Sequence, residues 1–301
     1  MKEIDVLVIG AGPAGLSAAG YAARAGYKTM AIDAMAPGGQ LMLIDDIENY
    51  PGVPTTKGFQ LAESLQNQAE SFGVEIAFNG ANSIRKEGDR FIVDTEDGEI
   101  VAKAVIAATG ATHRHLGAIG EEQYAGRGVS YCATCDGPFF KGKRIVVVGG
   151  GDTALTDALY LAKLSDDVTI VHRRDAFRGQ QVLVDRVKNS NIKLRLSRNV
   201  VEVLSEDKKK VTGVKLDNGD IIDTDAVFIF VGIQPNSAMF KEFVETDRSG
   251  FIVTDDKMQT SVPGFFAAGD VRTTQFRQVV TATGDGAMAA HMADHYIQNL
   301  R

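Results

Sequence analysis

The sequence is poor in cysteine, and it has neither a long apolar run nor a long basic run. Only two cysteines occur in 301 residues, Cys132 and Cys135. A single pair this close together provides no disulfide framework of the kind that stabilises small secreted proteins. The longest apolar stretches, such as 145–148 and 226–231, have the length of strands and are far too short to cross a bilayer. We therefore expect no membrane span.

The charge balance argues against a polyanionic partner. The chain carries 32 lysines and arginines against 39 acidic residues, a formal net charge of -7. Its longest basic run, 208–210, reads as a hairpin turn, so no nucleic-acid partner is expected. The chain enters an apolar segment at Ile4 without a signal region, which predicts a cytoplasmic protein. With 44% hydrophobic and 24% charged residues, it is long enough for two globular domains.

A nucleotide-binding pattern opens the chain. The apolar segment 4–10 leads into Gly10-Ala-Gly12-Pro-Ala-Gly15 and then an alanine-rich stretch that predicts a helix to about Arg24. The glycines permit a tight turn and close approach of a pyrophosphate to the helix N-terminus. A second predicted strand, 28–32, is followed by Asp33, 23 positions after Gly10, where a carboxylate would accept a ribose hydroxyl. The first unit is therefore predicted to bind FAD or NAD.

The same pattern returns in the middle of the chain. Residues 144–149 lead into Gly149-Gly-Gly151-Asp152-Thr153-Ala154 and a predicted helix to about Lys163. A further predicted strand, 167–171, is followed by basic residues at the position that Asp33 holds in the first unit, namely His172, Arg173, Arg174 and, a little later, Arg178. Guanidinium groups match the 2′-phosphate of NADP. We infer FAD in the first unit and NADPH in the second; the alternative is that these arginines form a solvated basic face.

Segments typical of a flavin site lie on both sides of the second unit. They are 38–40, 49–51 and 108–110 before it, and 269–270 and 277–278 after it. The sequence therefore predicts an α/β fold with two Rossmann-like nucleotide-binding domains, the second inserted into the first. The expected FAD-binding domain comprises 1–113 and 236–301, and the expected NADPH-binding domain is 114–235, with loop-like crossings between them.

The Cys132-Ala-Thr-Cys135-Asp136 segment lies within the second unit. Its spacing brings both sulfurs within disulfide reach, and a helix start there would lower a thiol pKa. Zinc would need two more ligands, and the five histidines form no matching second pair with cysteine, so no metal site is expected. Asp136 follows the second cysteine directly; it is a candidate proton relay or a helix N-cap, and one role does not exclude the other.

Taken together, these motifs resemble the low-molecular-weight thioredoxin reductases of bacteria and archaea, within the pyridine nucleotide-disulfide oxidoreductase class. The resemblance covers nearly the whole chain. It implies that Cys135 takes electrons from the flavin, that Cys132 exchanges with the disulfide of thioredoxin, and that Asp136 is the acid-base group. It also implies a homodimer. Arg127, Phe139 and Phe140 would be candidate thioredoxin contacts, although the aromatic pair fits a core position equally well.

The resemblance also implies two sets of cofactor-binding residues. The FAD set is Gly10, Gly12, Pro13, Ala14, Gly15, Asp33, Gly39, Gln40, Asn49, Thr109, Gly110, Gly269, Asp270, Arg277, Gln278 and Val279. The NADPH set is Gly149, Gly151, Asp152, Thr153, Ala154, His172, Arg173, Arg174 and Arg178. The chain departs from the family pattern at Thr156-Asp157, at Gly179 and at Asp285, and the sequence offers no physical account of Asp285.

Other functions remain open at this point. The chain would also suit an NADPH-linked flavin oxidase or an electron donor to another disulfide protein. The two cysteines disfavour a ferredoxin–NADP reductase, and the arginines disfavour an oxygen-using dithiol oxidase. Outside enzymes, a nucleotide-binding redox sensor would need no proton relay beside its thiols.

Overall fold

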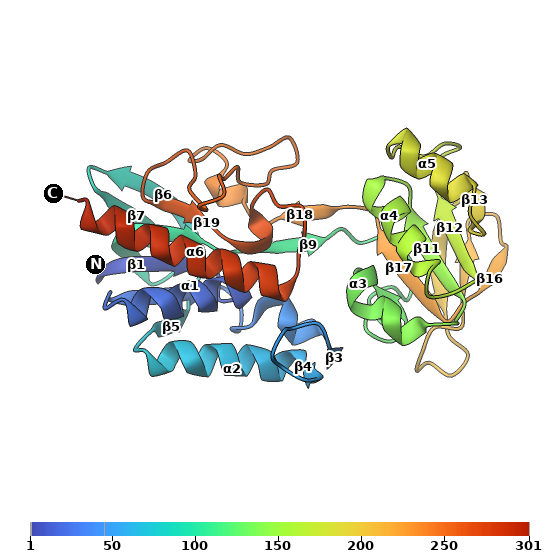
Figure 1. The fold of residues 1–301 in the computed structure, drawn as a ribbon, viewed down its shortest axis with the longest axis horizontal. Helices are drawn as coiled ribbons and strands as arrows, with labels where there is room; N and C mark the ends of the chain where they lie inside the picture. Colours follow the sequence, from blue (N-terminus) through green and yellow to red (C-terminus); the bar gives the residue numbers. More distant parts are fainter. Residues whose placement is uncertain (1, 45, 301) are drawn as a thin grey trace. The chain divides into compact units, whose positions relative to one another are not determined.

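The computed structural model describes residues 2–44 and 46–300, and the chain divides into two compact units (Figure 1). The first comprises Met1–Thr112 with Gln234–Arg301, and the second is His113–Ile233. The predicted α/β class is confirmed. The expected assignment of FAD to residues 1–113 and 236–301, and of NADPH to residues 114–235, stays a prediction.

The first unit is built on a mixed sheet of seven strands. Its parallel strands run in the order β5-β2-β1-β8, β19 adds in parallel along the C-terminal half of β8, and β7 and β6 extend the sheet antiparallel. The strands are β1 (Lys2–Ile9), β2 (Thr29–Asp33), β5 (Glu75–Phe78), β6 (Ala81–Glu87), β7 (Arg90–Thr95), β8 (Gly98–Ala107) and β19 (Phe265–Ala267). The second half of β1, residues 6–9, is apolar on both faces because both faces of the parallel part are covered.

Helices cover one face of this sheet. Helix α1 (Pro13–Arg24) packs between α6 (Val279–Gln298) and α2 (Gly58–Ser71), and its alanines let the helices approach closely. The opposite face carries an aromatic cluster that includes Phe91, Phe240 and Phe265. Shorter elements complete the unit: η1 (Gly39–Leu43), β3 (Asp46–Ile47), β4 (Thr56–Lys57), η3 (Ala238–Phe240) and η4 (Gly269–Val271).

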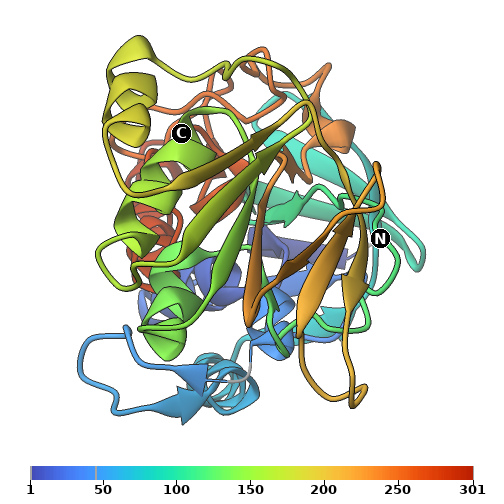
Figure 2. The same ribbon diagram turned by 90° about the vertical axis from the view of Figure 1, so that its right-hand side faces the viewer.

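The second unit has three layers, and the middle one is a parallel sheet. Its strands lie in the order β10-β17-β11-β12-β13. Helices cover one face of this sheet and a three-stranded antiparallel sheet covers the other (Figure 2). Alternate residues of β11 pack on opposite faces, Val147 with the helices and Val148 with the antiparallel sheet. The strands of the parallel sheet are β10 (Val129–Ser130), β11 (Ile145–Gly149), β12 (Val168–His172), β13 (Lys193–Leu196) and β17 (Ala226–Phe230). The outer layers are α3 (Ala133–Asp136), η2 (Gly137–Phe140), α4 (Asp152–Leu161) and α5 (Gln181–Lys188), and, opposite them, β14 (Val200–Leu204), β15 (Gly213–Leu216) and β16 (Ile221–Asp223).

The chain crosses between the units twice, and the crossings pair as a two-stranded sheet of β9 (Ala111–His113) and β18 (Ile233–Pro235).

Most local predictions are confirmed. Helix α1 ends at Arg24 as expected, and α4 ends at Leu161, two residues before the expected Lys163. Lys208 lies in the loop between β14 and β15 with a φ of 59°, as a hairpin turn allows. Within the described ranges 2–44 and 46–300, no helix combines the length and hydropathy of a membrane span.

Candidate functional site

The turn between β1 and α1 contains two glycines that the fold itself requires. Gly10 has a φ of +106°, and a Cβ there would lie 2.3 Å from the carbonyl oxygen of Ala108. A Cβ at Gly15 would lie 1.8 Å from the carbonyl oxygen of Gly10. Gly12 differs, because a Cβ there would approach only the Cα of Gly39, at 4.0 Å. The space beside Gly12, at the N-terminus of a twelve-residue helix, is therefore open to an anionic group.

Asp33 lies at the end of β2, beside this turn. Its Oδ2 accepts a hydrogen bond from the backbone N–H of Ala11 at 2.7 Å, and its Oδ1 accepts one from Met35 at 2.9 Å. These bonds fix the carboxylate at the C-terminal edge of the parallel sheet. A carboxylate held in this way suits a ribose hydroxyl, as the sequence predicts.

Segments from distant parts of the chain converge on the first turn of α1. A Cβ at Gly39, in η1, would lie 3.3 Å from the Cα of Gly12, and one at Gly269, in η4, would lie 2.8 Å from the Cβ of Ala14. The three glycine-containing motifs that were expected to bind FAD therefore meet in one place. A side chain at Gly269 would clash with Ala14, and one at Gly39 would press against Gly12 and would also be strained by the positive φ of 54°.

Several of the predicted flavin residues are engaged in hydrogen bonds that organise this region. Gln40 donates through Nε2 to the carbonyl of Ala111. Thr109 donates through its hydroxyl to the carbonyl of Asn236 at 2.6 Å, and Asn236 returns a bond to the carbonyl of Thr109 at 2.9 Å. The glycine that follows, Gly110, has a φ of +70°. These contacts join the segments on either side of the second unit.

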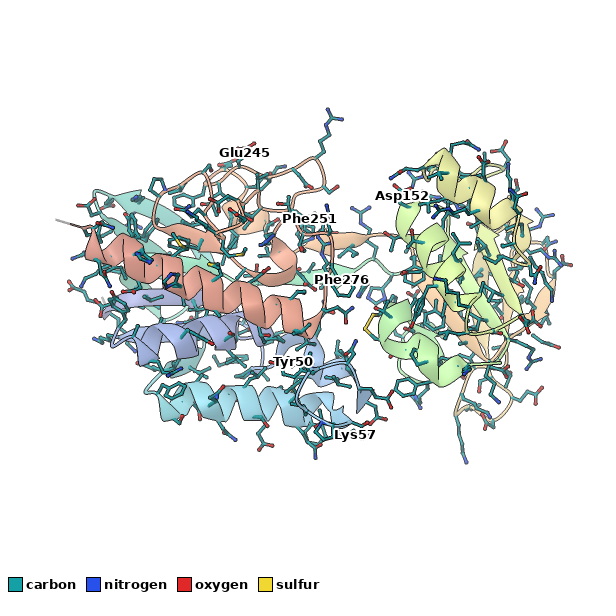
Figure 3. The ribbon with its side chains drawn as sticks, viewed as in Figure 1. Tyr50, Lys57, Asp152, Glu245, Phe251 and Phe276 are labelled. Carbon is teal, nitrogen blue, oxygen red and sulfur yellow. A yellow bond between two sulfur atoms is a disulfide. The ribbon has the colours of Figure 1, made fainter. Side chains whose placement is uncertain are left out.

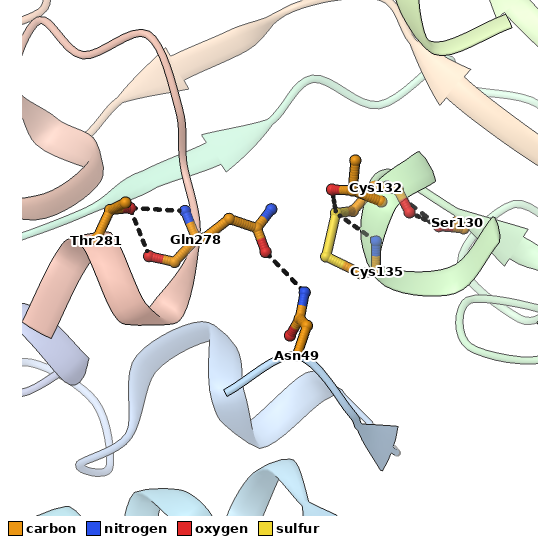
Figure 4. The surroundings of a disulfide bond; sticks show 7 residues. Asn49, Ser130, Cys132, Cys135, Gln278 and Thr281 are labelled. Carbon is orange, nitrogen blue, oxygen red and sulfur yellow. Dashed lines mark hydrogen bonds between the residues drawn. A yellow bond between two sulfur atoms is a disulfide. The ribbon is translucent and has the colours of Figure 1, made fainter. Parts of the chain in front are cut away.

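The start of α6 is held by a capping arrangement. Gln278 is the N-cap residue and Val279 the first helical residue. The backbone N–H of Gln278 donates to the hydroxyl of Thr281 at 3.1 Å, and Asn49 donates through Nδ2 to Oε1 of Gln278 at 3.0 Å (Figure 4). Asn49 and Gln278, 229 positions apart, are thereby brought together.

Asp285, which the sequence left unexplained, is bonded to the turn that carries Gly269 and Asp270. Its Oδ2 accepts the backbone N–H of Gly269 at 3.2 Å and forms an ion pair with Nε of Arg272 at 3.2 Å. Burial raises the pKa of Asp285, while the charge of Arg272 and the bond from Gly269 lower it. Burial also raises the pKa of Asp270, and the neighbouring Arg277 opposes that shift. Asp285 therefore has a structural role in fixing this turn.

Arg277, which was predicted to bind FAD, contacts an aromatic ring and nearby backbone carbonyls. Its guanidinium lies 4.3 Å from the ring centroid of Phe251, one of the residues labelled in Figure 3. Its Nη atoms donate to the carbonyls of Thr274 and Arg272 at 3.3 and 3.4 Å, and its buried Nε has no partner within the described part of the chain. Burial lowers the pKa of Arg277.

The turn between β11 and α4 repeats the geometry of the first. Gly149 has a φ of +152°, and a Cβ there would lie 2.5 Å from the carbonyl oxygen of Phe230. A Cβ at Gly151, the N-cap residue of α4, would meet nothing within 4 Å. The alanine at the third position of this motif, Ala154, is buried against Gly149. This turn therefore also presents open space at a helix N-terminus.

The basic segment that follows β12 is fixed beside this turn by backbone bonds. Arg178 donates through its backbone N–H to the carbonyl of Gly150 at 2.8 Å, and Asp152, labelled in Figure 3, accepts the N–H of Gln180 at 2.7 Å. Arg173, Arg174 and Arg178 are exposed, as is Thr153, the second residue of α4. Exposed guanidinium groups beside an open helix N-terminus fit a dinucleotide that carries an additional phosphate.

His172 differs from the arginines that follow it. Its ring is buried, and a Cβ at Gly150 would lie 2.4 Å from its Nδ1. Burial lowers its pKa, a bond with the backbone of Ala176 opposes this shift, and the nearby arginines add to it. The contact that the structure shows for His172 is therefore packing against the glycine turn, and its predicted role in binding NADPH stays a prediction.

Cys132 and Cys135 form a disulfide with a Cα–Cα distance of 5.3 Å (Figure 4). Cys132 is the N-cap residue of α3, and its sulfur accepts the backbone N–H of Cys135 at 3.2 Å. Its own N–H donates to the hydroxyl of Ser130 at 3.1 Å. Asp136 is the last residue of α3 and precedes η2, but its side chain does not cap η2. The N-cap alternative is therefore wrong for η2.

A buried carboxylate holds the segment before the disulfide, and sequence reasoning did not identify it. Glu121 is only 2% exposed and accepts hydrogen bonds from the backbone of Leu116 and Gly117, at 3.0 and 2.8 Å. It also accepts one from the hydroxyl of Tyr131, at 2.8 Å. Burial and this bond raise the pKa of Tyr131. No local pattern around Glu121 indicates burial, so only the tertiary structure identifies it.

The aromatic pair that follows the disulfide is divided between surface and core. Phe139 is 46% exposed, whereas Phe140 packs edge-on against Phe228 with a centroid distance of 5.9 Å. Arg127 is exposed and donates to the carbonyl of Gln123. Of the candidate partner contacts, Phe139 and Arg127 remain accessible.

Comparison with known proteins gives one consistent result. The model of the pyridine nucleotide-disulphide oxidoreductase family matches residues 4–286. A thioredoxin reductase of Treponema pallidum is 48% identical over 99% of both chains, and one of Bacillus subtilis is 43% identical over all of this chain and 96% of its own. Among solved structures, a thioredoxin reductase from Streptococcus pyogenes superposes with a TM-score of 0.94 at 44% identity, covering 99% of each chain.

Proposed function

This chain belongs to the pyridine nucleotide-disulphide oxidoreductase family, and on that premise we propose that it is an FAD-dependent enzyme that uses NADPH to reduce the disulfide of thioredoxin. The observation that carries this proposal is the Cys132–Cys135 disulfide, placed in the same compact unit as the Gly149–Gly151 turn. The match extends over 99% and 96% of the two thioredoxin reductases named above, which supports the same activity.

Within this proposal, the first unit holds FAD and the second holds NADPH. The open space beside Gly12 and the anchored carboxylate of Asp33 support a pyrophosphate and a ribose at the first turn. The open space beside Gly151 and the exposed Arg173 and Arg174 support the phosphates of NADPH at the second. FAD held at the first turn would supply the two-electron redox chemistry that links NADPH to the Cys132–Cys135 disulfide.

The dithiol then carries out two exchange steps. Two electrons and two protons convert the Cys132–Cys135 disulfide into two thiols. The thiolate of Cys132 attacks a sulfur of the partner disulfide, forming a mixed disulfide and releasing one partner thiol. The thiolate of Cys135 next attacks the sulfur of Cys132, restores the internal disulfide and releases the second partner thiol. Asp136, the residue after Cys135, supplies and removes the protons of the departing sulfurs.

Hydrogen bonds around Cys132 support its assignment as the attacking thiol. The N–H of Cys135 points at its sulfur, and a donor at this position stabilises a thiolate. Ser130 and the Tyr131–Glu121 bond fix the backbone on the N-terminal side of Cys132. Phe139 and Arg127 would contact thioredoxin, whereas Phe140, which packs against Phe228, would not.

The proposal is tested by anaerobic reduction of the purified, FAD-loaded protein. Stoichiometric NADPH should bleach the flavin absorbance, and NADH at the same concentration should act far more slowly. Oxidised thioredoxin added next should restore the flavin spectrum and gain two thiols per molecule. Bleaching without transfer to thioredoxin would point instead to an electron donor for a different disulfide protein. Rapid reoxidation by oxygen alone would point to an oxidase.

We also propose a homodimer in a reducing, cytoplasmic compartment. Exposed apolar side chains on neighbouring elements support an interface on the first unit: Met42 and Leu43 on η1 are 47% and 84% exposed, and Phe59 on α2 is 50% exposed. The absence of any cysteine beyond the redox pair supports the compartment. Sedimentation of the wild type and of Leu43→Glu would test the interface, since the charged variant should sediment as a monomer.

A further inference from the structure

Two histidines on α6 lie close together, far along the helix from its N-cap. His291 and His295 are both exposed and are separated by one helical turn, a spacing that places them on the same face. Their Nε2 atoms are 3.2 Å apart, and their rings are nearly perpendicular, with centroids 4.5 Å apart. Neither residue takes part in the nucleotide turns or the dithiol.

The separation of the two nitrogens is that of neighbouring ligands on one metal ion. With metal–nitrogen distances of about 2.0–2.1 Å, ligands at a right angle would be about 2.9 Å apart, and ligands at a tetrahedral angle about 3.4 Å apart. The observed 3.2 Å lies between these limits. We propose that Nε2 of His291 and Nε2 of His295 form a binding site for a divalent transition-metal ion, with water in the remaining coordination positions.

The surroundings of the pair favour a cation. Asp294 lies between the two histidines in sequence and accepts hydrogen bonds from Tyr27 and from Gln298. Its carboxylate lies one residue from His295 on the same helix, and a nearby negative charge favours a bound cation. His295 also belongs to the last turn of α6, where the helix dipole favours positive charge.

The ligand set defines which ions should bind. Imidazole nitrogen suits Cu²⁺, Ni²⁺ and Zn²⁺, and Cu²⁺ should bind most tightly, whereas Mg²⁺ and Ca²⁺ prefer oxygen ligands. Among the residues that the structure describes, no group of three or more potential ligands surrounds a common point. The site should therefore be open and exchangeable. Both Nε2 atoms must be unprotonated to bind, so acidification should release the metal.

The same 3.2 Å separation also fits a hydrogen bond between two neutral imidazoles, and the experiment must distinguish the two. We would titrate untagged, FAD-loaded protein with Zn²⁺ by calorimetry and with Cu²⁺ by electron paramagnetic resonance. The dithiol must stay oxidised, since reduced cysteines would compete for both ions. The test variants are His291→Gln and His295→Gln, and the matched control is the double variant His113→Gln/His115→Gln, which removes the chain's other close histidine pair.

The proposal predicts one ion per chain and a Cu²⁺ spectrum with two coordinated nitrogens. Since even an outer-shell partner typically contributes about 10–100-fold to metal affinity, either single variant should lose at least about tenfold. The His113/His115 control should bind as the wild type does. Wild-type affinity in His291→Gln or His295→Gln, loss of binding in the control, or one ion per two chains would each overturn the single-chain site.

Discussion

Replacing Gly12 with alanine should separate flavin binding from folding. The backbone at Gly12 is extended, with φ of -76° and ψ of -173°, and the added methyl group would approach only the Cα of Gly39, at 4.0 Å. Gly15 provides the contrast. A methyl group there would lie 1.8 Å from the carbonyl oxygen of Gly10, a backbone atom that cannot move aside without distorting the turn.

The expected sizes of the two effects follow from these contacts. In Gly12→Ala, reduced entropy of the unfolded chain stabilises by about 0.4–1 kcal/mol, and the poorer N-cap costs about 0.5–1 kcal/mol. The flavin-free variant should therefore unfold within about 1 kcal/mol of the wild type. If the methyl group displaces the pyrophosphate from one backbone N–H, the lost charge-assisted bond is worth about 1.5–3 kcal/mol. That loss corresponds to about 10- to 150-fold in FAD affinity.

Urea unfolding of the flavin-free proteins and FAD titration followed by flavin fluorescence would measure both quantities. Gly12→Ala should keep the stability of the flavin-free protein but bind FAD weakly. Gly15→Ala should lose both stability and FAD affinity, because overpacking against the backbone costs about 1–3 kcal/mol or more. Wild-type FAD affinity in Gly12→Ala would show that no pyrophosphate lies against this turn. Equal destabilisation of the two flavin-free variants would refute the steric argument.

Three further predictions concern charged groups. Replacing both Arg173 and Arg174 with alanine should raise the KM for NADPH by about 10-fold or more per lost contact, with little change in the KM for NADH. Equal effects on the two donors in steady-state kinetics would contradict the assignment of these arginines to the 2′-phosphate. Burial raises the pKa of Asp157 from 3.8 to about 6, so the folded state should lose stability as the pH rises from about 4 to about 6. Asp157→Asn should therefore match the wild type below about pH 4 and be up to about 3 kcal/mol more stable at neutral pH in urea unfolding; equal stability of the two proteins at neutral pH would contradict it. Asp285→Ala should weaken FAD retention because it frees the N–H of Gly269, whereas Asp285→Asn still accepts that bond and should retain more FAD. Tighter FAD binding by the alanine variant than by the asparagine variant in FAD titrations would count against this role.

Local patterns in the sequence predict the two nucleotide turns well. In each turn, an apolar strand, a glycine turn and a helix follow one another within about 25 residues. A short window of sequence is therefore enough to predict the turn. The end of α1 at Arg24 and the position of Asp33 at the end of β2 are examples. The bounds differ by one or two residues: α4 ends at Leu161 and not near Lys163, and β12 begins at Val168 and not at 167.

Contacts between distant segments lie outside the reach of such patterns. The bonds of Thr109 with Asn236 and of Asn49 with Gln278 join positions more than 100 residues apart. The role of Asp285 becomes clear only when Gly269 and Arg272 are seen beside it. His172 is a further case: its place in a basic run does not reveal that its ring is buried against Gly150, which only the tertiary structure shows.

The most direct test of the central claim is thioredoxin-dependent oxidation of NADPH by Cys132→Ser and by Cys135→Ser, with mass spectrometry of the products. Both variants should still bleach the flavin with NADPH, and both should lose thioredoxin reduction. Cys135→Ser should in addition accumulate a covalent adduct between Cys132 and thioredoxin, because no thiol remains to resolve it. Substantial thioredoxin reduction by either variant would contradict the relay of electrons through this dithiol.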